Sequence, residues 1–356
     1  MDKLTVLALN LTNRCNLSCV HCGRDESIAR LSELPASFFE GVVNDAIELG
    51  LEQVNITGGE IFTRKDALPL IQKIAEKGLF VSIETNGVLL NPNIINELAT
   101  LGDSLRISFS MDGFDAKTHD LIRGKGSFEK TMNAINSVAD RGINARVISV
   151  LHKGNKTQIL PMAKHFNSIG LGFRLLPNII EYGKGVYACN VYGVSYDETQ
   201  KILDEYYDFL RENDSDRNSI EMNIALLPMD IESFGLCPWG SNMLGVGPQG
   251  VASLCHVANN ESGFIFGDLT RTPLNEIWEN NSVLAAFRNL DPDKLGGICG
   301  NCLARNLCKG ACRLHAASKY NDFYAPDPQC QTFYNLGVFP THAMENEDLD
   351  CTYPRK

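Results

Sequence analysis

Three cysteines near the start of the chain have the spacing of cluster ligands. Cys15, Cys19 and Cys22 form a C-x3-C-x2-C pattern directly after an apolar segment. Three thiolates on one loop can hold three irons of a cuboidal iron–sulfur cluster, and the fourth iron then stays open to another molecule. A structural zinc ion is the alternative, because tetrahedral zinc needs a fourth nearby ligand and His21 could provide it.

A second group of cysteines lies in the last third of the chain. Its pattern is Cys237, then Gly250-x4-Cys255, then Cys299-x2-Cys302-x5-Cys308-x3-Cys312, and finally Cys330. Twelve cysteines would suggest disulfides in a short secreted protein, but in 356 residues without an export signal they indicate metal or cluster binding. Cys189 and Cys351 fall outside both groups, and we expect free thiols there.

The segments that must position the first cysteine group alternate between strand and helix patterns. Strands are predicted at residues 4–11, 53–57, 79–84, 105–111, 145–151 and 172–176. Helices are predicted at residues 35–49, 66–77, 91–101, 127–141 and 156–168. This series of β–α units predicts an α/β fold with a parallel sheet, whose ligands gather at the carboxyl ends of the strands. Periodicity does not decide whether the sheet closes into a barrel.

Changes of pattern along the chain predict four parts. Residues 1–194 form the α/β core, although the pattern stops at 178–194, and residues 195–232 form a joint that begins with a helix over 195–212. Residues 233–335 form a cysteine-rich, loop-rich unit with one helix around 274–290, which relies on its metal for a core. Residues 336–356 are expected to be a polar, solvated tail.

Composition and charge exclude several classes of protein. The net charge of -11 opposes attraction to nucleic acid or anionic lipid. The longest apolar stretches, such as residues 147–151, fall far short of the roughly 18 residues that span a bilayer. The first residues do not have the pattern of a secretory signal, so we expect a cytoplasmic protein.

Motifs at the ends of the predicted strands resemble the radical S-adenosylmethionine (SAM) superfamily. Thr57-Gly58-Gly59-Glu60 ends the second strand, Glu84-Thr85-Asn86-Gly87 follows the third, and Ser110-Met111-Asp112-Gly113 follows the fourth. Together with the cysteine loop they resemble enzymes in which a four-iron, four-sulfur cluster with one open iron reductively cleaves SAM. The resemblance implies a partial (β/α)6 barrel of the TIM type.

The same resemblance implies which residues contact SAM. Gly58 and Gly59 would let the backbone approach the methionine end, and Glu60 would take its amine. Arg123 offers a fork suited to the methionine carboxylate. The full set of expected SAM contacts is Gly58, Gly59, Glu60, Glu84, Asn86, Ser110, Arg123 and Leu176, with Leu176 or its neighbour Leu175 against the adenine.

The second cysteine group resembles the SPASM extension, which binds auxiliary four-iron, four-sulfur clusters in enzymes that mature peptides and proteins. The family's pattern assigns one cluster to Cys299, Cys302, Cys308 and Cys330. It assigns a second cluster to Cys237, Cys255 and Cys312. This second cluster lacks a fourth cysteine, so its remaining iron would be open to substrate, a small ligand or another side chain.

The residue that would act as a general base on the substrate is harder to identify from the sequence than the cluster ligands. In the sulfatase-maturing branch an aspartate follows the Gly-x4-Cys cysteine, and here that position is His256. Histidine, with a reference pKa of about 6.5, can act as a base. A hydrogen bond beside a cluster is the simpler role for this residue. Asp230 and Glu232 are the alternative bases.

The resemblance implies an oxidoreductase that makes a 5'-deoxyadenosyl radical and oxidatively modifies a ribosomally made peptide or protein. The modification would be a new C–C, C–S or C–N bond, or a dehydrogenation. A reductant such as flavodoxin or ferredoxin is implied. Because the first strand begins within a few residues of Met1, the leader is expected to be recognised by a separate leader-binding protein or by the joint and the tail.

Two other hypotheses remain. One is oxidative decarboxylation of propionates in tetrapyrrole or haem-type biosynthesis, in which Arg174, Arg305 and Arg313 could pair with substrate carboxylates. The other is a non-enzymatic iron–sulfur electron carrier or a zinc scaffold. This last hypothesis does not explain why Gly58, Gly59 and Glu60 follow the cysteine loop at the next strand end.

Overall fold

One curved sheet organises the molecule. The computed structural model describes residues 3–23, 32–213, 217–228, 230, 240–258 and 261–354. The strands in these ranges are β1 (Val6–Asn10), β2 (Gln53–Thr57), β3 (Phe80–Thr85), β4 (Leu105–Ser110), β5 (Ala145–Val150), β6 (Gly172–Leu176), β7 (Ser219–Ile220), β8 (Met243–Val246), β9 (Val251–Ser253) and β10 (Ile265–Asp268). They form a single sheet in the order β10-β9-β8-β1-β2-β3-β4-β5-β6-β7.

The first six strands confirm the predicted parallel α/β core. Each pairs in parallel with the next, from β1 with β2 through to β5 with β6. Alternate residues such as Ile83 and Ile107 are buried in the hydrophobic core, as expected where helices cover one face of a sheet. The carboxyl ends of these strands therefore lie along one edge.

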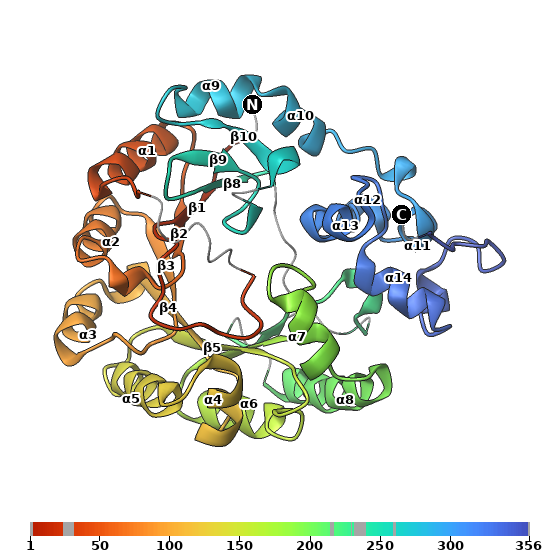
Figure 1. Ribbon diagram of the computed structural model, residues 1–356, viewed down its shortest axis with the longest axis horizontal. Coiled ribbons are helices and arrows are strands. Elements are labelled where there is room, and N and C mark those ends of the chain that lie inside the picture. Colours follow the sequence, from red (N-terminus) through yellow and green to blue (C-terminus); the bar gives the residue numbers. More distant parts are fainter. Residues whose placement is uncertain are drawn as a thin grey trace.

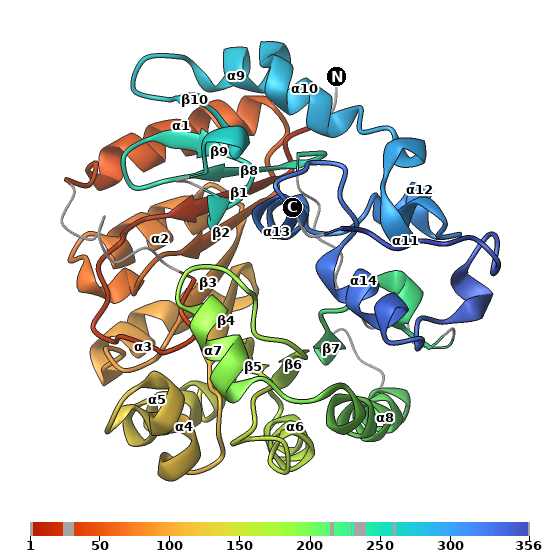
Figure 2. The same ribbon diagram turned by 45° about the vertical axis from the view of Figure 1, so that its right-hand side comes forward.

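Six helices cover the outer face of this sheet in both ribbon views (Figures 1 and 2). They are α1 (Ala36–Glu48), α2 (Ala67–Glu76), α3 (Pro92–Ala99), α4 (Ala116–Arg123), α5 (Ser127–Ala139) and α6 (Ile159–Ser168). The five predicted helices of the core are confirmed. Asn91 starts α3 because its side chain accepts hydrogen bonds from two backbone N–H groups and Pro92 follows it. The short helix α4, capped by Asp115, was not predicted.

Two further helices follow β6. The first, α7 (Gly185–Tyr192), lies where the sequence pattern stops, and no helix was expected there. It buries only Gly185 and Ala188, so its sequence lacks the apolar stripe that marks a packed helix. The second, α8 (Tyr196–Glu212), confirms the helix predicted for the joint and buries an apolar face that includes Leu203 and Tyr206.

The cysteine-rich part of the chain is joined to the core sheet, which the sequence did not predict. Strand β8 pairs in parallel with β1, in the register Val6 with Met243 to Leu9 with Val246. Strands β9 and β10 then add antiparallel pairs. The loop-rich unit therefore contains three short strands, β8, β9 and β10, that were not predicted. The short strands, of three or four residues, gave too little alternation to be recognised.

The rest of the cysteine-rich part is more helical than expected. Its helices are α9 (Leu274–Asn280), α10 (Ser282–Arg288), α11 (Gly297–Gly300), α12 (Arg305–Cys308), α13 (Arg313–Tyr320) and α14 (Pro328–Asn335). Asn281 divides the single predicted helix at 274–290, because it ends α9 and caps α10. Helices α11 to α14 lie on the open side of the curved sheet (Figures 1 and 2). In the described ranges every helix falls short of what is needed to cross a lipid bilayer.

The final segment is only partly the solvated tail that was predicted. Residues 345–350 are exposed, but Ala343 and Cys351 are buried. The N–H of Leu303 donates to the Ala343 carbonyl, and Gln331 Nε2 donates to the Cys351 carbonyl at 3.0 Å. The segment therefore packs back onto α14 and onto the turn after α11, through contacts that its acidic composition did not indicate.

Candidate functional site

The loop that carries Cys15, Cys19 and Cys22 leaves the carboxyl end of β1. The backbone N–H of Leu17 donates to Cys15 Sγ at 3.4 Å. The N–H of Val20 donates to the Ile122 carbonyl in α4, and the N–H of Lys184 donates to the Cys22 carbonyl. The loop is therefore held on one side by α4 and on the other by the segment that leads into α7.

Gly58 and Gly59 lie directly against this loop. A Cβ on Gly58 would stand 2.6 Å from the Thr12 carbonyl oxygen, and one on Gly59 would stand 2.2 Å from the Arg14 carbonyl oxygen. The Gly59 N–H donates to Thr12 at 2.7 Å, and the Glu60 N–H donates to Arg14 at 2.9 Å. Glycine is therefore required here for contact between β2 and the cysteine loop, a reason that the sequence did not reveal.

Glu60 is buried beneath the loop, with 1% of its surface exposed. Thr85 Oγ1 donates to its Oε1, and the Asn86 N–H donates to its Oε2, both at 2.8 Å. Burial raises the pKa of Glu60, and these donors only partly offset the effect. A cationic group beside this carboxylate would favour its ionised form, which suits the ammonium group of an amino acid.

Asn86 connects the end of β3 to the same loop. Its Nδ2 donates to Asn16 Oδ1 at 2.8 Å, next to Cys15, and its carbonyl accepts from Thr131 Oγ1 at 2.7 Å. Glu84 lies two residues earlier, and its Oε2 accepts from Thr57 Oγ1 at 3.0 Å. Ser110 and Leu176, the remaining strand-end candidates, are half-buried at the ends of β4 and β6.

Arg123 is paired with a buried carboxylate. Its Nε donates to Asp112 Oδ2 at 2.6 Å, and Asp112 has no exposed surface. Asp112 Oδ1 accepts from the Val150 N–H at 2.8 Å. Burial alone would raise the pKa of Asp112, but Arg123, His21 and the Val150 N–H together outweigh it and hold the pKa well below the usual carboxyl range. Asp112 therefore fixes the orientation of the Arg123 fork.

Histidines surround this carboxylate. His21 Nε2 lies 3.3 Å from Asp112 Oδ2. The residue considered as a fourth zinc ligand is therefore paired with a carboxylate instead. Burial lowers the pKa of His21 to about 4, so the ring is neutral near pH 7. His119 Nδ1 accepts from the Asp112 N–H at 3.2 Å, and His152 Nε2 lies 2.7 Å from the Asp112 carbonyl. His152 was not singled out in the sequence, because only the fold brings it to β4.

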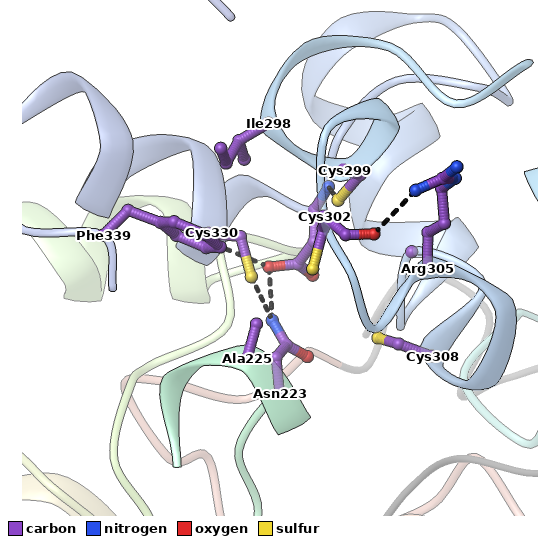
Figure 3. Close-up of a pocket in the computed structure, with 11 residues that line it drawn as sticks. Asn223, Ala225, Ile298, Cys299, Cys302, Arg305, Cys308, Cys330 and Phe339 are labelled. Atoms are coloured by element: carbon purple, nitrogen blue, oxygen red, sulfur yellow. Dashed lines mark hydrogen bonds between the residues drawn. The ribbon is translucent and has the colours of Figure 1, made fainter. Parts of the chain in front are cut away.

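Four cysteines of the second group line one pocket. Cys299, Cys302, Cys308 and Cys330 surround it together with Asn223 and Asp327. They come from α11, the turn after it, the end of α12 and α14, and Figure 3 shows them around a shared space. The structure thus brings together the four residues that the sequence pattern grouped.

The backbone around this pocket favours thiolates. The Asp327 N–H donates to Cys299 Sγ at 3.2 Å, and Asn223 Nδ2 donates to Cys330 Sγ at 3.3 Å. Lys309, Gly310 and Ala311 have φ angles of 49°, 73° and 53°, and within this left-handed run the Ala311 N–H interacts with Cys308 and lowers the pKa of that thiol.

Burial works against thiolates unless a positive charge is present. It raises the pKa of the Cys308 thiol to about 11, and it raises the pKa values of Cys299 and Cys330 as well. Around the first loop it raises the pKa of Cys19 to about 11, although Arg123 opposes it. Iron would supply the missing charge and displace the thiol protons. Both thiol sets therefore fit iron–sulfur clusters.

The structure also brings Cys255 near Cys312. Burial raises the pKa of the Cys312 thiol to about 12, and the charge of Cys255 adds to this rise. Strand β8 passes so close that a Cβ on Gly245 would stand 2.5 Å from the Cys255 carbonyl carbon. His256 follows Cys255 and is half-buried. Cys237 and Glu232 lie outside the described residues, so the full ligand set stays a prediction.

Several other candidates have structural partners. Arg313 is buried, and its Nη1 donates to the carbonyls of Phe323 and Ala325, so it supports the backbone instead of facing a substrate. Arg305 pairs with Asp293 and Glu345. Asp230 accepts from Arg211 Nε and Nη2 at 2.7 and 3.2 Å.

The two unassigned cysteines differ in their surroundings. Cys189 Sγ lies 3.9 Å from Glu181 Oε1, and burial together with that carboxylate raises the pKa of the thiol. Cys351 is buried in the final segment, and its N–H donates to Tyr334 Oη at 2.9 Å. Both thiols are thus packed by local contacts in the described part of the chain.

Comparisons with known proteins agree with both halves of this arrangement. Residues 9–165 match the radical SAM superfamily, and residues 237–303 match SPASM, an iron–sulfur cluster-binding domain. The AdoMet-dependent heme synthase of Methanosarcina barkeri is 28% identical, over 91% of this chain and 95% of that protein. The PqqA peptide cyclase of Granulibacter bethesdensis is 25% identical, over 97% of this chain and 90% of that protein.

A solved structure shares the fold. Streptococcus suis SuiB, bound to the precursor peptide SuiA, superposes with a TM-score of 0.74 at 17% identity, over 93% of this chain and 76% of that one. The matched regions contain the cysteine loop and most of the second cysteine group. The chain therefore carries a radical SAM domain and a SPASM domain, and it is an enzyme of this kind that uses SAM and iron–sulfur clusters.

Proposed function

We propose that this enzyme oxidatively modifies a ribosomally made peptide or protein. The observation that carries the proposal is the pairing, on one chain, of the barrel-edge cysteine loop with a separate pocket lined by Cys299, Cys302, Cys308 and Cys330. A second redox site suits a net oxidation, because an oxidised substrate must give up an electron. The similarity to PqqA peptide cyclase over almost the whole chain supports a peptide as the substrate.

An apolar rim beside the cysteine loop also supports a peptide. Ile180, Val186 and Tyr187 are 56%, 53% and 67% exposed on α7 and the segment before it. This segment contacts the loop, since the Lys184 N–H donates to the Cys22 carbonyl and Lys184 Nζ donates to Ser18 Oγ at 2.9 Å. Exposed apolar side chains grouped in this way are typical of a binding surface.

In the proposed arrangement each residue of the site has one task. Cys15, Cys19 and Cys22 hold the cluster that binds SAM, and Glu60 takes the SAM amine. Arg123, oriented by Asp112, takes the methionine carboxylate, while Gly58, Gly59, Glu84, Asn86, Ser110 and Leu176 complete the SAM site. When bound, SAM and this cluster supply a 5'-deoxyadenosyl radical, and the auxiliary clusters supply electron acceptors.

The auxiliary ligands are assigned in the same proposal. Cys299, Cys302, Cys308 and Cys330 hold one cluster. Cys237, Cys255 and Cys312 hold the other, whose fourth position is open to a non-cysteine ligand. A reductant such as flavodoxin or ferredoxin provides electrons, and a separate leader-binding protein presents the peptide.

The experiment that tests the proposal compares two substrates. The protein is reconstituted anaerobically, reduced, and incubated with SAM and the peptide encoded beside its gene. We expect 5'-deoxyadenosine and a peptide that is lighter by two hydrogen atoms, detected by mass spectrometry. Loss of carbon dioxide from iron coproporphyrin III, with no change in the peptide, would contradict the peptide proposal. It would favour the haem-type alternative, which the heme synthase of M. barkeri supports.

Replacing Asn223 by alanine should weaken the auxiliary site. The variant loses the hydrogen bond from Nδ2 to Cys330 Sγ, and losing such a partner typically lowers metal retention about tenfold or more. The rate of iron release to a chelator measures the effect. Asn289→Ala is the control, because Asn289 is exposed and bonds only within its own helix. Equal release rates in both variants would remove Asn223 from the site.

His256 is proposed as the base in preference to Asp230. Arg211 holds both Asp230 oxygens, and this hydrogen bonding lowers the pKa of the exposed Asp230 carboxyl, which makes it a weaker base. His256→Asn should lower peptide modification about tenfold or more, while 5'-deoxyadenosine formation continues. Asp230→Asn should change neither rate by more than about twofold. The opposite pattern of rates would assign the base to Asp230.

A further inference from the structure

Three arginines face the inside of the curved sheet from neighbouring strands. They are Arg106 on β4, Arg146 on β5 and Arg174 on β6, and we call them the arginine belt. Phe173 stacks on Phe166 of α6 with ring centroids 6.4 Å apart, so the next residue, Arg174, points to the opposite, concave face. The same alternation applies to the other two strands.

On β4 and β5 the neighbours of the belt are buried on the helix side. Ile107 and Val147 are fully buried in the core, while Arg106 and Arg146 are half-buried. The register pairs Ser108 with Arg146, and Arg146 Nε donates to Ser108 Oγ at 3.0 Å across the two strands. The belt therefore lines the interior of the partial barrel and not its helix-covered surface.

The belt has fewer anionic partners than guanidinium groups. Arg174 Nη2 donates to Glu221 Oε2 at 2.6 Å. Ser108 is a neutral partner of Arg146, and Arg106 lies over the Phe80 ring, with its Cζ 5.4 Å from the centroid. Within the described residues neither Arg106 nor Arg146 has an ion pair, and the Nε atoms of Arg106 and Arg174 are buried without a hydrogen-bond partner.

This arrangement is electrostatically unfavourable by itself. Burial, and then the charges of Arg106 and Arg174, lower the pKa of Arg146 to about 10, although Glu84 and Glu221 oppose the shift. Like charges held together away from bulk water repel one another. An anion between them would relieve this repulsion, and the planar guanidinium fork matches a carboxylate.

The arginine belt lies a few residues before the carboxyl ends of β4 and β6. Arg106 precedes Ser110, at the end of β4, by four residues, which is about 13 Å at the usual rise of a strand. Arg174 precedes Leu176 by two residues, or about 7 Å. A substrate held at the belt can therefore extend along the barrel interior to the edge where the cysteine loop begins.

We propose that the arginine belt anchors a carboxylate of the substrate, at a distance of about 7 to 13 Å along the strands from their carboxyl ends. This inference rests on the proposed function and adds a substrate class to it. An acidic peptide side chain and a tetrapyrrole propionate both carry the required group. The shared chemistry is an alkyl carboxylate presented to two or three guanidinium groups.

A binding experiment tests the belt without a known substrate. Glutarate and its uncharged analogue glutaramide are titrated into the SAM-loaded holoenzyme, and the thermal midpoint is followed. We expect glutarate, but not glutaramide, to raise the midpoint. In the double variant Arg106→Gln, Arg146→Gln the Kd for glutarate should rise about tenfold or more, because hydrogen bonds to charged groups are lost. Arg271→Gln, at a side chain that is 84% exposed, is the matched control and should bind as the wild type does.

The same variants separate binding from a structural role. With the repulsion removed, the ligand-free double variant should unfold at the wild-type midpoint or above it. A lower midpoint without ligand, or wild-type affinity for glutarate, would overturn the proposal. A response to glutaramide equal to that of glutarate would also overturn it, because the belt would then not recognise charge.

Substrate assays distinguish this inference from the proposed function. The neighbouring peptide is compared with a version whose Asp and Glu are replaced by Asn and Gln, and iron coproporphyrin III is compared with its methyl ester. If the wild type modifies the peptide and the double variant does so with an unchanged KM, the belt proposal falls and the function stands. If belt-dependent glutarate binding is found but no peptide is modified, the function falls and the belt stands. Conversion of the free porphyrin but not its ester would identify a propionate as the carboxylate that the belt binds.

Discussion

Alanine in place of Gly59 is expected to lower 5'-deoxyadenosine formation to less than about one hundredth of the wild-type rate. The added Cβ would stand 2.2 Å from the Arg14 carbonyl oxygen, where only backbone can move to relieve the contact. The displaced segment would be the start of the cysteine loop, because the Glu60 N–H donates to the same oxygen. A misplacement of about 1 Å in a catalytic site costs about 100-fold in rate. Anaerobic assay of SAM cleavage measures the change.

The control for this variant is Gly41→Ala. Gly41 lies within α1, its backbone is helical, and a Cβ there would meet no atom within 4 Å. We expect this variant to cleave SAM at the wild-type rate and to be slightly more stable, because alanine is the better helix former. Iron analysis should show that Gly59→Ala loses iron from the first site while retaining the auxiliary iron. Wild-type activity in Gly59→Ala would refute the close contact between β2 and the loop.

Replacing Asp112 by asparagine is expected to destabilise the fold by about 3 to 5 kcal/mol. Asparagine keeps the size of the side chain and an acceptor for the Val150 N–H, so the variant removes mainly the negative charge. Arg123 would then be buried without its partner, since its Nε donates to Asp112 Oδ2 at 2.6 Å and Asp112 itself has no exposed surface. An uncompensated buried charge is the main cost. The midpoint of urea denaturation, followed by circular dichroism, measures it.

The position of Arg123 gives a second measurement for the same variant. If Asp112 orients the Arg123 fork toward SAM, the variant should bind SAM more weakly, and equilibrium dialysis with the anaerobic holoenzyme detects this change. Asp103→Asn is the control, because Asp103 is exposed in the short turn before β4. An unchanged denaturation midpoint would mean that solvent, and not Asp112, neutralises Arg123. Unchanged SAM binding would remove Arg123 from the carboxylate site.

The two cysteine groups show how much a local pattern can predict. Cys15, Cys19 and Cys22 lie within eight residues, so their spacing alone keeps their thiols on one loop. Cys299, Cys302, Cys308 and Cys330 span 32 residues, and here the resemblance to the SPASM extension assigned them to one cluster; they line one pocket. The six parallel strands were also predicted, because alternating burial on each strand leaves a pattern in a handful of residues.

Features that depend on distant segments could not be predicted in this way. Strand β8 pairs with β1 although Met243 lies 237 residues after Val6 in the chain, and no short pattern records that choice. The glycine pair after β2 was assigned to SAM from the resemblance, and its contacts with backbone atoms of Thr12 and Arg14 were not predicted. In both cases the deciding contact joins segments whose separation along the chain carries no periodic signal.

By itself the sequence determined the chemistry that is available, since thiol spacing, strand-end motifs and charge are properties of short segments. Only the tertiary structure decided how that chemistry is arranged. It placed His21 and Arg123 on the buried Asp112, and it turned Arg106, Arg146 and Arg174 toward one interior. The physical reason is that burial and charge pairing depend on which distant surfaces exclude water together, and that is settled when the sheet curves and the helices pack.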